Sequence, residues 1–184
     1  SSEFHIEKNI EWRDSFKSHF KKIVVEKNLA VVPSWEKNID HMGETIYIEP
    51  GLGFGTGGHE TTSLCLSYLK RELKNNNHIL DLGCGSGILG IYAQKYKEAN
   101  CDYVDVDLDA LENCRLNIEI NGLNSDSIIC RDDFKPKKYD VVIANILLPV
   151  LLSEKEIINS CLKEGSLLIM SGIIRSQLED LKRA

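Results

Sequence analysis

The feature that most constrains the fold is an alternation of short apolar runs with helical patterns, which begins at His78 and continues to the end of the chain. The apolar runs are rich in β-branched residues, and such alternation is typical of a parallel sheet with crossover helices. Strands are predicted over residues 78–82, 99–107, 127–130, 139–145 and 165–172. Helices are predicted over residues 88–96, 110–121, 147–162 and 174–183. We therefore expect an α/β fold, a doubly wound and mostly parallel sheet with helices on both faces.

Composition limits the class of protein. The chain has 184 residues, of which 42% are hydrophobic, so one globular domain can bury a substantial core. A net charge of −6 argues against a broad basic surface, and no direct nucleic-acid partner is expected. The six cysteines include no Cys-x-x-Cys pair and no histidine at metal-ligand spacing, which predicts reduced thiols, a cytoplasmic location and no metal. No apolar run reaches the roughly 20 residues that span a bilayer, so no membrane contact is expected.

The segment DLGCGSG, residues 81–87, follows the first of these strands and opens a helix. Gly83 and Gly85 permit positive φ and the close approach of a ligand, and a helix start offers free N–H groups. Asp105 lies near the end of the next predicted strand, at the spacing where a carboxylate binds vicinal ribose hydroxyls. The pattern therefore predicts an adenosine-containing cofactor without deciding which one.

Asp81, the first residue of that segment, separates two candidate cofactors. A carboxylate here repels the pyrophosphate of a nicotinamide cofactor. It suits S-adenosylmethionine, which carries an ammonium group and a sulfonium and has no phosphate. Asp81 therefore favours a methyl donor, with a purely structural cap of the turn as the alternative.

A second glycine-rich segment, EPGLGFGTGGHETT, occupies residues 49–62. A phosphate-binding loop of the Walker type would end in Gly-Lys-Ser/Thr, but here Gly58 is followed by His59 and Glu60. From the residues alone, a flexible turn before a helix is the simplest interpretation.

Four segments together resemble one family. GLGFGTGGHETTSLCLSYL, ILDLGCGSGILGIYA, VDVDLDALENCRLNIEING and YDVVIANILLPVL are similar to the motifs of the PrmA family, methyltransferases of large-subunit ribosomal protein eleven. The glycines of residues 83–87 alone would indicate only the class I S-adenosylmethionine-dependent methyltransferases, whereas the first segment combined with ANIL at 144–147 is more specific. The resemblance, from Trp12 to Gly172, implies a Rossmann-like fold and S-adenosylmethionine as cofactor. It also implies transfer of methyl groups to amines, lysine side chains or an amino terminus, of a ribosomal protein.

The resemblance implies roles for individual residues. The glycine-rich segment would cover the cofactor, with Phe54 as a wall of the site and with Thr56 and Thr62 near the methionine end. Gly83 would bind through its backbone and Asp105 through the ribose. The cofactor-binding residues are therefore predicted to be Phe54, Thr56, Thr62, Asp81, Gly83, Gly85, Asp105 and Asn145.

The reacting end of the site is less fully specified. Asn145 would lie near the methionine moiety and the methyl group, as an orienting group. Asp132 or Asp133 is a candidate for the adenine amino group, although surface acidity explains either residue equally well. No residue is marked as the general base, so the catalytic residues stay unassigned.

The domain organisation departs from the family pattern in two ways. Members carry a separate amino-terminal domain that captures the ribosomal protein, and this chain begins at what resembles the linker into the catalytic domain. We expect residues 1–45 to be a helix and strand preface, in which Trp12, Phe16 and Phe20 recur at helical spacing and NLAVVP and ETIYIEP are short strands. Residues 46–184 would be the methyltransferase domain, without the antiparallel strand pair that usually finishes the superfamily's sheet.

Two other functions stay open. One is a class I methyltransferase that acts on another protein or on a small molecule. Asn145-Ile146-Leu147 in place of Asn-Pro-Pro-Tyr argues against the relatives that methylate amides. The other is a non-catalytic or nicotinamide-binding module that uses the same glycine turn.

Overall fold

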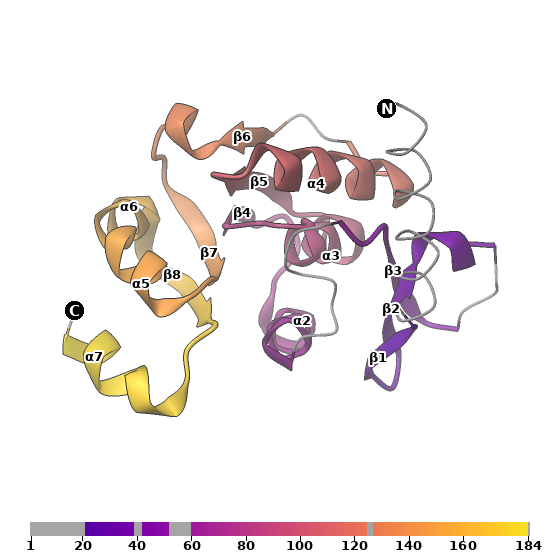
Figure 1. Ribbon diagram of the computed structural model, residues 1–184, viewed down its shortest axis with the longest axis horizontal. Helices are drawn as coiled ribbons and strands as arrows, with labels where there is room; N and C mark the ends of the chain where they lie inside the picture. Colours follow the sequence, from indigo (N-terminus) through magenta and orange to yellow (C-terminus); the bar gives the residue numbers. More distant parts are fainter. Residues whose placement is uncertain (1–20, 39–41, 52–59, 125–126, 184) are drawn as a thin grey trace, which may run out of the picture.

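The structure is a computed structural model that describes residues 21–38, 42–51, 60–124 and 127–183, arranged as in Figure 1. Its main sheet has the order β6-β5-β4-β7-β8, with parallel pairing throughout. The chain adds β5 and β6 on one side of β4, and then β7 and β8 on the other. This confirms the predicted doubly wound fold, and within the described residues the sheet has no antiparallel strand. The strands are β4 (His78–Leu82), β5 (Asn100–Asp105), β6 (Ile128–Cys130), β7 (Tyr139–Asn145) and β8 (Leu162–Ser171).

Helices cover both faces of this sheet, as predicted. Successive strand side chains point to opposite faces, so Ile79 belongs to one apolar cluster and Leu80 to the other. The first cluster includes side chains of α2 (Glu60–Glu72), α3 (Ile88–Lys97) and α4 (Leu108–Ile120). The second includes side chains of α5 (Leu148–Ser153) and α6 (Lys155–Cys161). The sheet is therefore buried between two helical layers.

Three predicted elements after β7 are wrong in their bounds. The single helix over residues 147–162 is divided, because Glu154 has φ −90° and ψ 1°, outside the helical range. Leu162 already pairs with Tyr139, so β8 begins before the predicted residue 165, and the pairing register then shifts. A turn, η3 (Arg175–Gln177), precedes α7 (Leu178–Arg183) where one helix from residue 174 is predicted. A further short turn, η2 (Arg131–Asp133), follows β6.

A small second sheet precedes the main one. It contains β1 (Ile23–Glu26), β2 (Leu29–Pro33) and β3 (Glu44–Ile48), of which the sequence analysis predicts only the last two. β1 and β2 pair antiparallel, whereas β2 and β3 are parallel, with η1 (Ser34–Glu36) in the connection. The helix predicted around Trp12 lies outside the described residues. The predicted boundary between residues 1–45 and 46–184 falls within β3, and this division stays a prediction.

The small sheet is joined to α3 by hydrogen bonds at Thr45. The Tyr96 hydroxyl accepts from the Thr45 amide at 2.6 Å and donates to its carbonyl at 2.8 Å. Lys95 Nζ donates to the same carbonyl at 2.8 Å and lies 5.2 Å from the centre of the Tyr47 ring. Burial lowers the pKa of Lys95. The edge of β3 is thus satisfied by side chains rather than by another strand.

A substitution at Gly90 would test how closely α3 packs on β5. An alanine Cβ at this position would lie 2.3 Å from Tyr103 Cε1 and 2.6 Å from Cys101 Sγ, both in the core. Helix propensity alone favours alanine over glycine. Crowding should outweigh it, so we expect Gly90→Ala to lower the free energy of unfolding by about 1–3 kcal/mol in urea denaturation. An unchanged or higher stability would contradict this packing.

Candidate functional site

The carboxyl ends of β5, β4 and β7 lie next to one another at one edge of the main sheet. Asp81 is the penultimate residue of β4, Asp105 ends β5 and Asn145 ends β7. The winding direction reverses between β4 and β7, and ligands of open α/β sheets bind in the crevice outside such strand ends. Three residues that the sequence predicts to bind a cofactor therefore meet at this edge.

The turn of residues 83–87, which we call the glycine turn, is fixed by hydrogen bonds to the end of β5. Gly83, Gly85 and Gly87 have φ of 70°, 53° and 76°, a region that favours glycine. The amides of Gly83 and Cys84 donate to the Val104 carbonyl at 2.7 and 3.1 Å. The Gly85 amide donates to Asp105 Oδ2 at 2.9 Å. Asp105, which the sequence pattern pairs with this turn, therefore also stabilises the turn by a hydrogen bond.

Ile146 closes the site between two glycines, a role that the sequence analysis missed. A Cβ on Gly83 would lie 2.3 Å from Ile146 Cγ2. A Cβ on Gly172, just after β8, would lie 2.5 Å from the Ile146 carbonyl oxygen. The residue after β4 thus packs against the Ile146 side chain, and the residue after β8 packs against the Ile146 backbone. The motif ANIL contained this signal, but only as part of a family pattern.

Asp81 is buried, with 2% of its surface exposed, and its Oδ2 accepts from the Gly90 amide at 3.0 Å. Burial raises the pKa of Asp81 to about 7, the Gly90 hydrogen bond opposes this shift, and the Asp105 charge adds to it. The carboxylate therefore caps the start of α3, which is the structural role that the sequence analysis left as an alternative. Contact with a cofactor ammonium stays a prediction.

Thr62 and Asn145 are brought together from positions far apart in the sequence. Asn145 Nδ2 donates to Thr62 Oγ1 at 3.2 Å, so a residue of α2 meets the end of β7. Thr62 is 1% exposed, whereas Asn145 is half-buried. Through Asn145 this polar pair lies at the same sheet edge as Asp105, and its role in cofactor binding stays a prediction.

Comparison with known proteins identifies the family. The family model described as "Ribosomal protein L11 methyltransferase (PrmA)" matches residues 2–184. The chain belongs to this family. It is 38% identical over 175 residues to the ribosomal protein L11 methyltransferase of Caldanaerobacter subterraneus, covering 94% of this chain and 57% of that protein. The chain thus spans a little over half the length of the curated relatives it matches.

Solved structures agree with the fold. A ribosomal protein L11 methylase from Lactobacillus delbrueckii superposes with a TM-score of 0.76 and 30% identity, covering 89% of this chain and 86% of that one. A SAM-dependent methyltransferase from Thiobacillus denitrificans, in complex with S-adenosyl-L-homocysteine, has a TM-score of 0.50 and 19% identity. It covers 58% of this chain and 47% of that one, and at this identity the likeness concerns the fold alone.

The other predicted residues are not tied to the site by the structure. Phe54 and Thr56 lie outside the described residues. Asp132 and Asp133 are exposed residues of η2, after the neighbouring strand β6, so the choice between them at adenine stays open.

The thiols in and near the glycine turn have raised pKa values, which disfavour the nucleophilic thiolate form. Cys84 and Cys114 interact, and this interaction together with burial raises the pKa of Cys84. Burial also raises the pKa of Cys101 and of Cys65. All six cysteines are free, as predicted for reduced thiols. In the described part of the chain, no group of histidine, cysteine and acidic residues is placed to hold a metal ion.

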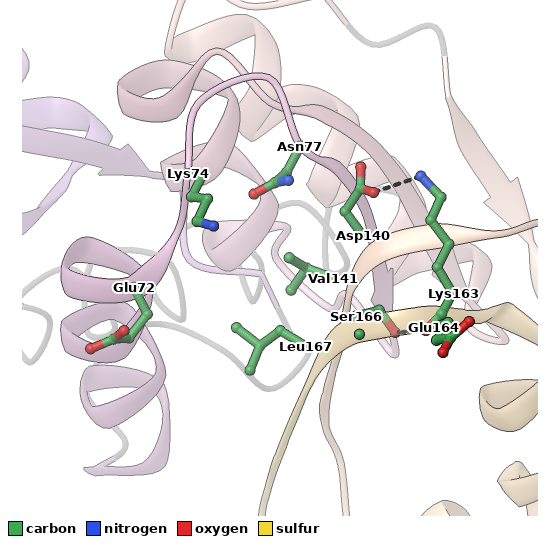
Figure 2. A pocket seen from close by; sticks show the side chains of 10 residues that line it. Glu72, Lys74, Asn77, Asp140, Val141, Lys163, Glu164, Ser166 and Leu167 are labelled. Carbon is green, nitrogen blue, oxygen red and sulfur yellow. Dashed lines mark hydrogen bonds and ion pairs between the residues drawn. The ribbon is translucent and has the colours of Figure 1, made fainter.

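A cavity of about 250 Å³ lies at the other edge of the sheet, where β4 and β7 begin (Figure 2). Asp140 and Lys163 form an ion pair at 2.6 Å in its lining, and the hydrogen bonds from Lys163 and from the His78 amide hold the pKa of Asp140 below its usual range. Its other charged lining residues, Glu72, Lys74 and Glu164, are exposed. This cavity is separate from the glycine turn and holds none of the predicted cofactor residues.

The buried carboxyl of Asp81 predicts a pH dependence of stability. Its folded pKa of about 7 is above the ordinary value of 3.8, so the folded chain retains a proton that the unfolded chain releases. Stability from this group is complete below about pH 4 and is lost as the pH rises towards 7. Asp81→Asn lacks the titrating group, so the wild-type free energy of unfolding should fall relative to this variant, by roughly 4 kcal/mol at most. Urea denaturation of both proteins across this range would measure the difference, and parallel curves would contradict the assignment.

Proposed function

We propose that this chain is the S-adenosylmethionine-binding, catalytic part of a protein methyltransferase that transfers methyl groups to amines of ribosomal protein L11. The amines would be lysine side chains or the amino terminus. Membership of the family supports the reaction. The location of the site is supported by the glycine turn that Asp105 holds and by the pair of Thr62 and Asn145 at the same sheet edge. This second observation carries the proposal, because Asp105 would bind the nucleoside end of the cofactor and Asn145 would lie at its reacting end.

The residues present fit S-adenosylmethionine better than a pyrophosphate cofactor. Two carboxylates lie next to the glycine turn: Asp105 accepts a hydrogen bond from the Gly85 amide of the turn, and Asp81 accepts one from the Gly90 amide in the first turn of α3. This negative charge attracts a cationic ligand and repels phosphate. Asp105 would hold the ribose hydroxyls, and the backbone of Gly83 and Gly85 would approach the ligand closely. When bound, the cofactor supplies a methyl group made electrophilic by the sulfonium.

The chain's own contribution to the reaction is the positioning of an amine. Bringing two reactants into line can remove about 7–11 kcal/mol of barrier without a covalent intermediate. With Nδ2 of Asn145 directed to Thr62, its Oδ1 is the acceptor that would orient an amine N–H. A lysine amine, with a pKa near 10.4 in water, must lose its proton before attack. The catalytic base stays unassigned.

The protein's partner and location complete the proposal. Relatives named for ribosomal protein L11 support that protein as the acceptor, and a cytoplasmic location follows for an enzyme of ribosomal proteins. In the described part of the chain, no helix is long and apolar enough to cross a membrane. We propose that a separate domain of the full-length protein recognises ribosomal protein L11 and presents it to this chain.

Isothermal titration with S-adenosylmethionine, S-adenosylhomocysteine and NAD tests the cofactor. We expect the first two to bind and NAD not to bind. Asp105→Asn keeps an acceptor for the Gly85 amide but removes the charge, so it should weaken S-adenosylmethionine binding roughly 10- to 100-fold. Asp109→Ala, an exposed acidic residue at the start of α4, is the matched control and should leave affinity within about twofold. A preference for NAD would sink the proposed cofactor, and full affinity in Asp105→Asn would sink the ribose assignment.

Methyl transfer to ribosomal protein L11 tests the acceptor. In a full-length protein that contains this chain, mass spectrometry should detect methylated amines on L11. Asn145→Ala should lower kcat about 100-fold, because a misplaced amine loses the in-line approach. Its affinity for S-adenosylmethionine should change far less, and a small molecule methylated in preference to L11 would favour the alternative acceptor.

A further inference from the structure

Three asparagines, two on α4 and one at its C-cap, bond to the edge of β3 that faces this helix. Asn113, Asn117 and Asn121 are four residues apart, so they lie along one side of the helix. Among the described residues, β3 is the last strand of the small sheet and has β2 as its strand partner. Asn121 accepts from the Tyr47 amide at 3.0 Å and donates to the Tyr47 carbonyl at 2.7 Å. Its side-chain amide thus pairs with β3 as a neighbouring strand would.

Asn117 makes a different set of bonds, because it joins β3 to the glycine turn. Its Oδ1 accepts from the Glu49 amide, just after β3, at 2.7 Å. Its Nδ2 donates to the carbonyl of Ser86 at 3.0 Å. Asn117 is fully buried, with 0% of its surface exposed, and Ser86 is buried as well. One short side chain therefore bridges two backbone segments that are not adjacent in the sequence.

The chemistry of this bridge requires an asparagine. One end of the side chain must accept from an amide and the other must donate to a carbonyl, which the carboxamide does in a fixed geometry. Aspartate could still accept from Glu49 but would set a second acceptor against the Ser86 carbonyl. Leucine, of similar size, could do neither, and a buried backbone group that loses a partner is costly.

The position of Ser86 gives the bridge a consequence for ligand binding. Ser86 stands between Gly85 and Gly87, both with positive φ, and glycine backbones have many alternative conformations. Ligand affinity falls in proportion to the fraction of molecules that hold the binding conformation. Asp105 fixes the turn by accepting from the Gly85 amide. Asn117 fixes it one residue later by donating to the Ser86 carbonyl.

We infer that Asn117 is a positioning residue of the cofactor site, which holds the glycine turn in its binding conformation through the Ser86 carbonyl. This inference rests on the proposed function, since the ligand of the turn is taken to be S-adenosylmethionine. Asn113 supports the same arrangement, because it donates to the Glu49 carbonyl at 3.0 Å and interacts with Asn117 at 3.3 Å. In the described part of the chain, the side chain of Asn117 bonds to the backbone of Glu49 and Ser86 and to Asn113. Its effect on the ligand is therefore indirect.

The test compares Asn117→Leu with Asn121→Leu. Both variants remove a side-chain amide of α4 that bonds the β3 segment, but only the first removes a bond to the glycine turn. Titration calorimetry, well below both unfolding midpoints, should show Asn117→Leu raising the Kd for S-adenosylmethionine roughly tenfold. Asn121→Leu should stay within about twofold of the wild type, even if its midpoint falls as far. Asn117→Asp, which keeps the bond from Glu49, should also weaken binding and serves if the leucine variant does not fold.

Amide chemical shifts separate positioning from general destabilisation. The signals of Gly85, Ser86 and Gly87 should move in Asn117→Leu and stay in place in Asn121→Leu. Equal losses of affinity in the two leucine variants, or unmoved signals of the turn in Asn117→Leu, would overturn the inference while the wild type still binds. A wild-type chain that binds no S-adenosylmethionine would overturn the proposed function, and with it this role.

Discussion

The site depends on the pairing of β4 with β5. That pairing sets Leu82 opposite Val104, so the Val104 carbonyl receives the first two amides of the glycine turn and the Asp105 carboxylate receives the Gly85 amide. A shift of one residue in the register would send Asp105 to the other face of the sheet, and the turn would lose both partners. The buried apolar residues on both faces of β4 and β5 specify this register, because a shift of one residue would place each side chain in the opposite cluster, where it does not fit its neighbours. Core packing therefore fixes the geometry of the site.

The small sheet depends on the same core in another way. In the described part of the chain, one edge of β3 has no strand partner. Backbone groups of Thr45 and Tyr47, and of Glu49 just after the strand, bond to side chains of α3, α4 and the α4 C-cap. Unpaired strand edges are costly when buried and prone to association when exposed. Side chains that bond to the backbone of this edge avoid both problems. They also hold β3 against α3, which begins just after the glycine turn, and against α4, which bonds to the turn through Asn117. Hydrogen bonds thus join β3 to β2 in the small sheet and, through Asn117, join the end of β3 to the glycine turn.

The sequence predicted the parts of this molecule that are encoded locally. The strands β4, β5 and β7 and the glycine turn follow from periodicity and from residues that a sharp turn requires, Asp105 follows from its spacing, and Asn145 was implied by the family resemblance. β1 was missed although it pairs with the next strand along the chain. The parallel pairing of β2 with β3 and the break at Glu154, which pairs with Arg131, were missed because they involve separate segments. The asparagines of α4 show the same limit. On a helix they look like an ordinary polar face, and only the fold brings Asn117 against Glu49, 68 residues away.

The electrostatics of the site connect stability with the proposed cofactor. Asp81 is buried in a region that raises its pKa, and Asp105 adds a second negative charge beside it, so the free protein carries a cost at neutral pH. A cation at the glycine turn would lower that pKa again and offset part of the cost, whereas a phosphate would increase it. Asp105, which binds the Gly85 amide of the turn, and Asp81, which binds the Gly90 amide just after it, would then select the charge of the ligand. A carboxylate in the position of Asp105 also occurs at turns that bind dinucleotides, so the second carboxylate, Asp81, is what would separate this turn from them.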